Sequence, residues 1–384
     1  MERLGRLVRG DNVDGVALEG RARCVFVHVQ NGLGNRLRAM GSGIALAKKT
    51  ARVPVIIWER DAHLSASFGD LFNPTPAPDS QKPEHVLYKN LLIVDQGFPR
   101  WKDIAVHEDT WRPYNYMLKD GEDATIHYPL PILGRGVANE DVGLENHVGD
   151  DSPSITADEP IQSSAHIYLK TAYVGQTIPR IVTRRQVNAE LRRLSPVPTV
   201  VALFHSHPVK DLQKAIGVHI RSRGIERDNV GVDTECEYTA SGARVTNYWR
   251  SRSGMSAFLN RMKHYIRLDR DATFFVAADD IAVTRTLQKQ FPGRILSIER
   301  ECDDRSPICV KYALADLMSL ARTRKLLGSH WSSFSEAASR LGGKRVFLSG
   351  RDFGKRQMGI WDTVQWHWAK LQDYMGRSPR CNID

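Results

Sequence analysis

Residues 216–223 read IGVHIRSR, a short apolar run that leads directly into basic positions. Because side chains alternate between the two faces of a strand, His219 and Arg221 are predicted on one face and the apolar side chains on the other. The end of such a strand in an open α/β sheet usually borders a ligand crevice. The guanidinium of Arg221 suits a diphosphate in that place. A basic strand end that simply faces solvent explains the same pattern.

Strand and helix patterns alternate around this stretch, which indicates a parallel, doubly wound sheet. The N-terminal half shows predicted strands at 24–30, 53–58 and 165–170, with a helix at 184–194 and a loop-rich region at 73–160. The C-terminal half shows strands at 273–278, 294–298, 325–328 and 346–349, and helices at 248–267, before 291, at 311–321 and at 334–341. An aromatic helix containing Trp361, Trp366 and Trp368 is predicted to end the chain.

The length of 384 residues and an apolar content of 41% favour two domains with full cores. The Pro-rich run at 195–198 separates a Rossmann-like domain, 1–195, from a second domain, 196–384. No run approaches the roughly 18–20 apolar residues of a membrane span. The opening residues, MERLGRLVRGDNVDG, lack the apolar core of a signal peptide.

The net charge of +10 favours an anionic partner. The basic residues are dispersed and no nucleic-acid-binding motif occurs, so a phosphorylated small molecule fits as well as nucleic acid. A solvated basic surface accounts for most of these charges. Five cysteines without a CxxC motif and the lack of an Asn-x-Ser/Thr acceptor favour a cytoplasmic protein, with the secretory lumen as the alternative. Cys302 and Cys309 are close enough in sequence to pair under oxidising conditions.

The turn NGLGNR joins the first strand to a helix, and its residues Gly32, Gly34, Asn35 and Arg36 are candidates for ligand binding. Glycines let a backbone approach a ligand, and a helix N-terminus offers free N–H groups to an anion. A tight turn explains a short Gly pair equally well. The pattern falls short of the dinucleotide fingerprint, because Arg38 stands near the place of a third Gly or Ala, which argues against an NAD enzyme.

Two further sites carry polar residues in or beside predicted helices. Asp316 lies in an apolar helix, where a carboxylate needs a partner: a basic side chain, or the N–H edge of a guanine. Ser332, Ser333 and Phe334 open a helix; Ser333 and Glu336 have the capping-box spacing, and the helix N-terminus would also cradle phosphate.

Acidic and histidine pairs complete the set of candidates. At 279–280 an acidic pair follows a strand: Asp279 is a candidate for a metal or a sugar hydroxyl, and Asp280 is predicted to cap the next helix. The pair His205 and His207 has metal-like spacing but lacks a third ligand, so no metal site is predicted.

Taken in order, four motifs resemble the GDP-fucose-dependent fucosyltransferases, the group of bacterial nodulation, core N-glycan and protein O-fucosyltransferases. They are NGLGNRLRAM at 31–40, IGVHIRSR at 216–223, VAADD at 276–280 and ADLMSLARTRKLLGSHWSSFSEAASRL at 315–341. NGLGNR is also similar to the opening of plant cell-wall fucosyltransferases. The resemblance covers the C-terminal half and the first strand and helix, whereas the middle of the chain is unmatched.

This resemblance implies a GT-B type α/β fold, in which two Rossmann-like domains face a cleft that holds GDP-fucose. The first domain would lie on the acceptor side. His219 and Asp316 would contact the guanosine, Arg221 the diphosphate, and Ser332, Ser333 and Phe334 the donor. Residues 34–36 would face the donor from the first domain. The implied enzyme is inverting and metal-independent and needs no cofactor; Arg221 stabilises the departing GDP and the acceptor is a glycan or protein hydroxyl.

The chain departs from the core-type enzymes at one position. Those enzymes have two adjacent arginines, whereas Ser222 follows Arg221 here and the next cation is Arg223. The resemblance also implies an acidic base in the loop after Arg221. Four acidic residues are available there, and spacing favours Asp228; some relatives work without an obvious base.

Alternative functions are a transferase that uses another nucleotide sugar and a non-catalytic nucleotide- or glycan-binding module. A nucleic-acid-binding protein is the least favoured reading. The sequence leaves the acceptor, the linkage, the catalytic base and the oligomeric state open.

Overall fold

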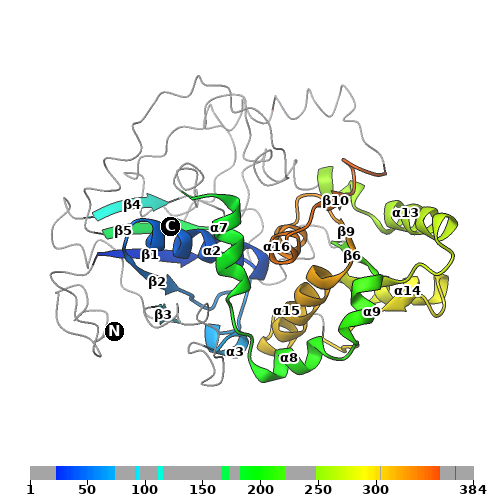
Figure 1. Ribbon diagram of the computed structural model, residues 1–384, viewed down its shortest axis with the longest axis horizontal. Helices are drawn as coiled ribbons and strands as arrows, with labels where there is room; N and C mark the ends of the chain where they lie inside the picture. The colour runs from blue at the N-terminus through cyan, green and yellow to red at the C-terminus, as the bar shows by residue number, and fades with distance from the viewer. Residues whose placement is uncertain are drawn as a thin grey trace. The chain divides into compact units, whose positions relative to one another are not determined.

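The computed structural model describes residues 23–73, 91–95, 111–115, 166–172, 182–221, 248–302, 304–354 and 368. Contacts divide the chain into unit 1, Met1–Val197, and unit 2, Pro198–Asp384. The described residues of each unit form one five-stranded sheet, in which every strand pair is parallel. The α/β class and the Rossmann-like character predicted from the sequence are therefore confirmed (Figure 1).

The sheet of unit 1 has the strand order β3-β2-β1-β5-β4. Its first three strands run outward in chain order from the central strand, and β5 lies on the other side of that strand. The strands are β1 (Cys24–Val29), β2 (Val53–Ile57), β3 (Leu92–Val94), β4 (Trp111–Asn115) and β5 (His166–Thr171). The helices are α2 (Leu33–Lys49), α3 (Phe68–Leu71) and α7 (Arg184–Arg192).

The core of unit 1 forms where α2 packs on the fully buried strand β1. Gly43 of α2 allows this close approach, because a Cβ built there would lie 2.2 Å from Cγ2 of Val27. On its other side α2 contacts α7, where the buried Glu190 binds Lys48 and accepts a 2.8 Å hydrogen bond from Arg193. The helix is thus fixed between the sheet and α7.

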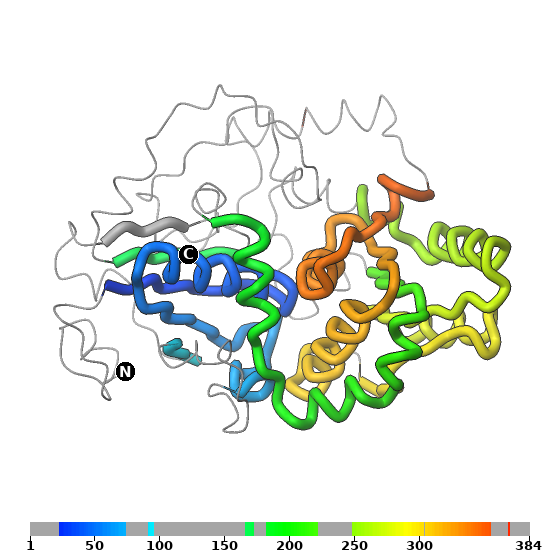
Figure 2. Tube along the Cα trace, in the orientation of Figure 1, coloured from blue at the N-terminus to red at the C-terminus, as the bar shows by residue number. Residues whose placement is uncertain are grey.

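The sheet of unit 2 has the order β10-β9-β6-β7-β8. Helices follow the strands in alternation, a path that the colour gradient of Figure 2 traces from green to orange. The strands are β6 (Ile216–Ile220), β7 (Phe274–Ala278), β8 (Ile295–Leu296), β9 (Lys325–Gly328) and β10 (Val346–Leu348). The helices are α8 (Pro198–Phe204), α9 (Val209–Lys214), α13 (Met255–Leu268), α14 (Ile281–Gln290), α15 (Pro307–Arg322) and α16 (Ser333–Gly342).

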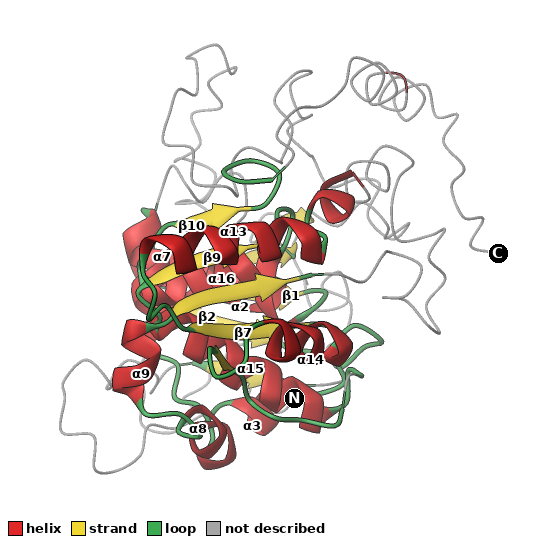
Figure 3. Ribbon diagram, turned by 90° about the vertical axis from the view of Figure 1, so that its right-hand side faces the viewer, coloured by secondary structure: helices red, strands yellow, loops and turns green. Residues whose placement is uncertain are grey.

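Helices cover both faces of this sheet (Figures 1 and 3). Ile216, Val218 and Ile220 pack in one hydrophobic cluster with residues of α13 and α14. His219 contacts α16 instead, through Ser335 and Phe334. The alternation predicted for β6 is therefore confirmed, because His219 and the apolar residues of the strand lie against different helices.

The structure differs from the sequence-based expectation in two places, and one further prediction is not tested. The helix predicted at 248–267 is interrupted at Ser253 and Gly254, and α13 begins only after this glycine N-cap. The short helices α8 and α9 were not expected. The predicted aromatic C-terminal helix lies almost entirely outside the described residues.

His166 at the start of β5 gives unit 1 a pH-dependent stability. Its side chain is buried, and burial, with Arg52, lowers its pKa from 6.5 to about 4. The unfolded chain then binds more protons than the folded protein between these values, so stability is present above pH 6.5 and lost as the pH falls towards 4. In His166→Phe this loss is absent. Between pH 6.5 and about 4, the difference in free energy of unfolding between the variant and the wild type is therefore expected to change by about 1.4 kcal/mol per pH unit in favour of the variant. Urea unfolding at pH 7 and pH 5 measures this, and an unchanged difference between the two proteins would contradict it.

Candidate functional site

The sheet of unit 2 reverses its winding between β6 and β9. Counted along the chain, its five strands have the order 3-2-1-4-5, and β6 and β9 are the first and fourth strands. Ligands of open α/β sheets bind outside the carboxyl ends of the strands at this switch point. The residues that follow β6 and β9 are Arg221 and Ser329 to Ser332, so the switch point brings together two motifs that lie far apart in the sequence.

His219 is held at the end of β6 by α16. Its Nδ1 lies 2.7 Å from Oγ of Ser335, and its ring stacks on Phe334 with 4.7 Å between centroids. Burial lowers the pKa of His219 to about 3; nearby Asp279 opposes this shift, while Arg221 and Arg300 reinforce it. His219 is therefore neutral at physiological pH, with one ring nitrogen as donor and the other as acceptor.

Arg221 directly follows β6, and its backbone is fixed while its side chain stays partly exposed. Its N–H donates to Oγ of Ser329 at 2.8 Å, and Ser329 in turn donates to the carbonyl of His219. The Nε atom lies 3.4 Å from Oδ2 of Asp279, a long ion pair in which 31% of the Arg221 side chain is exposed. This guanidinium is therefore placed at the strand end and is accessible to an anion.

Asp316 lies in the buried face of α15, and the close approach of that helix to the sheet places it there. Gly217 of β6 permits the approach, since a Cβ at this residue would lie 2.6 Å from Oγ1 of Thr323. Burial raises the pKa of Asp316 to about 7, and the guanidinium of Arg300 opposes the shift. Arg300 Nη1 lies 2.8 Å from Oδ2 of Asp316, so the basic partner considered from the sequence is present.

The loop from β9 to α16 is strained and leaves the helix start uncapped. Trp331 has a φ of 59°, a left-handed conformation that is costly for a bulky residue and is often found at functional sites. The N-cap of α16 is Ser332, whose side chain makes no capping hydrogen bond. The capping box predicted from Ser333 and Glu336 is therefore wrong. Glu336 instead forms a buried ion pair with Arg340 one turn further along the helix.

The glycine turn of unit 1 occupies the corresponding position, at the carboxyl end of β1. Asn31 has a left-handed φ of 63°, and Gly32 is the N-cap of α2. In the described part of the chain no atom lies within 4 Å of a Cβ built at Gly32, so packing does not demand glycine there. Gly34 is buried, whereas Asn35 is partly exposed and its Oδ1 accepts from Arg38 at 2.9 Å.

Arg36 lies in the interior of unit 1. Its guanidinium donates to the carbonyls of Asn31 and Glu59 and to the carboxylate of Asp61, at 2.5–2.8 Å. Its side chain is fully buried and lies against Trp58. In this arrangement Arg36 fixes the glycine turn to the segment after β2, and it offers no exposed donor to a ligand.

The remaining candidates have different outcomes. Asp280 caps α14, as predicted, by accepting from Ala282 N–H at 2.8 Å. Arg223 and Asp228 lie outside the described residues. His205 and His207 lie in the turn between α8 and α9.

Within the described ranges no group of three or more His, Cys, Asp or Glu side chains is placed to hold a metal ion. In the same ranges no helix is both long and apolar enough to cross a membrane.

Sequence reasoning missed three residues that build this site: Ser329, Ser335 and Arg300. The two serines have a detectable signal, because they lie in the motif at 315–341 next to candidates that were selected. Arg300 lies in an irregular segment after the two-residue strand β8, and nothing in its local sequence distinguishes it from an arginine on a solvent-exposed loop.

Comparison with known proteins gives structural likeness without sequence matches. No family model matches the chain, and no curated protein matches it in sequence. The fucosyltransferase NodZ from Bradyrhizobium is 15% identical with a TM-score of 0.44, covering 83% of this chain and 92% of that one. A mutant of Arabidopsis thaliana FUT1 in complex with GDP is 15% identical with a TM-score of 0.48, covering 91% and 74%. The apo form of POFUT1 is 12% identical with a TM-score of 0.48, covering 88% and 100%.

Proposed function

We propose that the protein is a glycosyltransferase that moves fucose from GDP-fucose to a hydroxyl of a glycan or a protein. The observation that carries this proposal is the position of Arg221, a partly exposed guanidinium at the switch point of the unit 2 sheet. Arg221 directly follows β6, and the uncapped start of α16 follows the neighbouring parallel strand β9, so both lie at the same edge of the sheet. The four motifs that resemble fucosyltransferases supply the choice of donor.

Each described residue of the site has a role in this proposal. Arg221 and the free N–H groups at the start of α16, with Ser332 and Ser333, bind the diphosphate. Asp316 accepts N–H groups of the guanine, and neutral His219 makes a directional hydrogen bond to the nucleoside. Phe334 supports His219 by stacking on it. Asp279 orients Arg221.

Unit 1 and the segment after Arg221 complete the proposal. Gly32, Gly34 and Asn35 form the candidate ligand-binding turn of unit 1, and Arg36 holds that turn from inside. Unit 1 is proposed as the acceptor-side domain and unit 2 as the donor-binding domain. Arg223 is the candidate for a second cation on the diphosphate, and Asp228 is the candidate base.

The proposed reaction is inverting and uses no metal ion. An acceptor oxygen forms a bond to the anomeric carbon of fucose as the bond from that carbon to the diphosphate oxygen breaks. The electron pair leaves on GDP, where Arg221 stabilises the negative charge. The proton of the acceptor hydroxyl passes to the base.

Thermal stability in the presence of nucleotides tests the proposed donor. GDP and GDP-fucose are expected to raise the unfolding midpoint of unit 2 by about 5 °C or more at ligand concentrations near 100 times Kd, because a ligand that binds only the folded state adds about 2.7 kcal/mol there. UDP, ADP and their sugars are expected to give smaller shifts. The measurement is a thermal-shift titration of the full chain.

The same titration, together with an assay for the release of fucose from GDP-fucose, separates the alternatives. A larger shift with UDP or ADP would identify another nucleotide sugar as the donor and overturn the choice of GDP-fucose. A shift with duplex DNA alone would indicate a nucleic-acid-binding protein. GDP binding without release of fucose from GDP-fucose in the presence of glycan acceptors would favour a non-catalytic binding module.

A further inference from the structure

Arg300 joins three parts of unit 2 that border the candidate site. Its Nη1 lies 2.8 Å from Oδ2 of Asp316, and its Nη2 donates to the carbonyl of Ala278 at 2.6 Å. Ala278 is the last residue of β7, directly before Asp279. Only 15% of the Arg300 side chain and 5% of that of Asp316 are exposed. The guanidinium thus fixes the carboxylate of α15 relative to the end of the neighbouring strand.

The carboxylate of Asp316 has one oxygen that its protein partners do not use. Oδ2 binds Arg300, whereas Oδ1 accepts no hydrogen bond from any residue in the described ranges. Oδ1 retains some contact with solvent. A ligand that brings an N–H group could therefore bind this oxygen in place of water.

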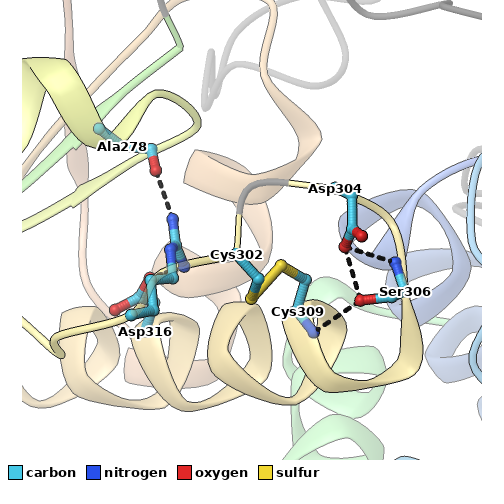
Figure 4. Close-up of a disulfide and its surroundings, with 7 residues drawn as sticks. Ala278, Cys302, Asp304, Ser306, Cys309 and Asp316 are labelled. Atoms are coloured by element: carbon cyan, nitrogen blue, oxygen red, sulfur yellow. Dashed lines mark hydrogen bonds and ion pairs between the residues drawn. A yellow bond between two sulfur atoms is a disulfide. The ribbon is translucent and has the colours of Figure 1, made fainter.

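The segment that carries Arg300 is tied to the beginning of α15 (Figure 4). Cys302 and Cys309 form a disulfide between this segment and the first turn of the helix. Ser306 caps the helix by accepting from Cys309 N–H, and its own N–H donates to Asp304 at 2.9 Å. The helix that bears Asp316 and the segment that bears Arg300 are thus covalently linked, which restricts how far the two can separate.

We infer that Arg300 is a positioning residue for the nucleotide: it favours the ionised form of Asp316, with one oxygen available to the N–H edge of a purine base, and the Cys302–Cys309 disulfide holds Arg300 in place. This inference rests on the proposed function, because it deepens the part that Asp316 has there. Arg300 does not touch the base in this scheme. It acts through Asp316.

The physical basis is the charge of a buried carboxylate. Burial favours the protonated form of Asp316, and Arg300 is the group that opposes this. Other charged groups lie on or directly after the elements packed against α15. Arg221 lies 3.4 Å from Asp279, Glu336 of α16 pairs with Arg340, and α9 carries Lys210, Asp211 and Lys214. His219 of β6 is neutral. Without Arg300, a higher pH is needed to ionise Asp316 and so to bind the base.

The test is the pH dependence of GDP affinity in wild type and Arg300→Met, measured by titration calorimetry between pH 5.5 and 8.5. The wild type is expected to lose affinity as Asp316 becomes protonated. In Arg300→Met the midpoint of this loss is expected to move up by about 1–3 pH units, which weakens binding at pH 7 by about fivefold or more. Arg300→Lys retains the charge and is expected to keep a midpoint close to that of the wild type.

Matched controls separate positioning from a general structural role. Arg324→Met removes an arginine from an exposed ion pair with Asp269 and is expected to leave the whole profile unchanged. Titration of GDP itself is common to all variants and cancels in the comparison. An equal loss of affinity at every pH in Arg300→Met, or no loss at all, would overturn the inference.

Two further variants show which part has failed. Asp316→Asn is expected to bind GDP weakly, with an affinity that no longer falls as the pH is lowered. If this variant binds GDP like the wild type, the proposed contact between Asp316 and guanine is wrong. If it binds weakly while Arg300→Met keeps the wild-type midpoint, only the inference about Arg300 fails. The double variant Cys302→Ser, Cys309→Ser is expected to shift the midpoint in the same direction as Arg300→Met, and an unshifted midpoint would remove the disulfide from the inference.

Discussion

Arg221→Ala is expected to lower the rate of fucose transfer by about 100- to 1,000-fold, the effect of removing one donor that stabilises charge in a transition state. The affinity for GDP is expected to fall by about tenfold to 100-fold, because charge-assisted hydrogen bonds to the diphosphate are lost. The fold should persist, since the contact that fixes this residue is its backbone N–H on Ser329. Release of GDP from GDP-fucose and calorimetric binding of GDP measure the two effects.

Two variants serve as controls for this result. Arg221→Lys keeps the charge but loses the planar fork of donors, so an intermediate loss is expected. Arg324→Ala removes a cation of the same unit from an exposed pair and should leave both quantities unchanged. Full activity in Arg221→Ala with unchanged GDP affinity would exclude Arg221 from the reaction and, with it, the observation on which the proposed function depends.

Gly43→Ala is expected to destabilise unit 1 by about 1–3 kcal/mol or more through overpacking. The added methyl would lie 2.2 Å from Cγ2 of Val27 and 3.0 Å from its Cγ1. Val27 is β-branched and buried in the central strand, so it cannot turn away cheaply. The higher helix propensity of alanine, about 1 kcal/mol, offsets only part of the cost. Equilibrium urea unfolding, followed through the transition of unit 1, measures the difference.

The same substitution at Gly69 of α3 provides the control. No described atom lies within 4 Å of a Cβ at this residue, and its φ is not positive. Gly69→Ala is therefore expected to leave unit 1 unchanged or to stabilise it by about 0.4–1 kcal/mol. Equal effects at the two glycines would contradict the close contact between α2 and β1.

Regular patterns in the sequence predicted the elements that place the site. The apolar alternation in 216–220 predicted a strand with His219 on the opposite face from Ile216, and the order of strands and helices predicted a parallel sheet. Both are confirmed, because burial of a sheet between two helical layers imposes a periodicity that a sequence retains. The strand ends follow from these elements, so the position of Arg221 at the end of β6 was predictable. That β9 lies beside β6 comes from the strand order of the structure.

Local patterns that have two physical solutions were not decided by the sequence. The spacing of Ser333 and Glu336 fits a capping box, but the side chain of Glu336 pairs with Arg340 instead. Residues four apart on a helix are neighbours, so Arg340 competes with the helix start for this carboxylate. The helix predicted at 248–267 has suitable residues throughout, yet Gly254 starts a new helix. Arg36 follows a glycine turn, where an anion-binding arginine and a buried structural one have the same local sequence.

The partner of Asp316 could not be predicted, for a different reason. A carboxylate in an apolar helix indicates that a partner exists, but the partner comes from a segment without periodicity after a two-residue strand. Only the tertiary structure brings Arg300 to it. Whether Asp228 or Arg223 contributes stays a prediction, because both lie outside the described residues.

The uncapped start of α16 has a consequence for how stability and binding are shared. A serine that caps a helix commonly contributes about 1 kcal/mol, and Ser332 holds that position without making the bond. Within the described residues this helix start therefore lacks a side-chain cap, at the place where an anion could bind its N–H groups. A nucleotide bound by these N–H groups would supply the hydrogen bonds that a capping side chain usually makes. Part of the free energy of nucleotide binding would then stabilise the fold of unit 2.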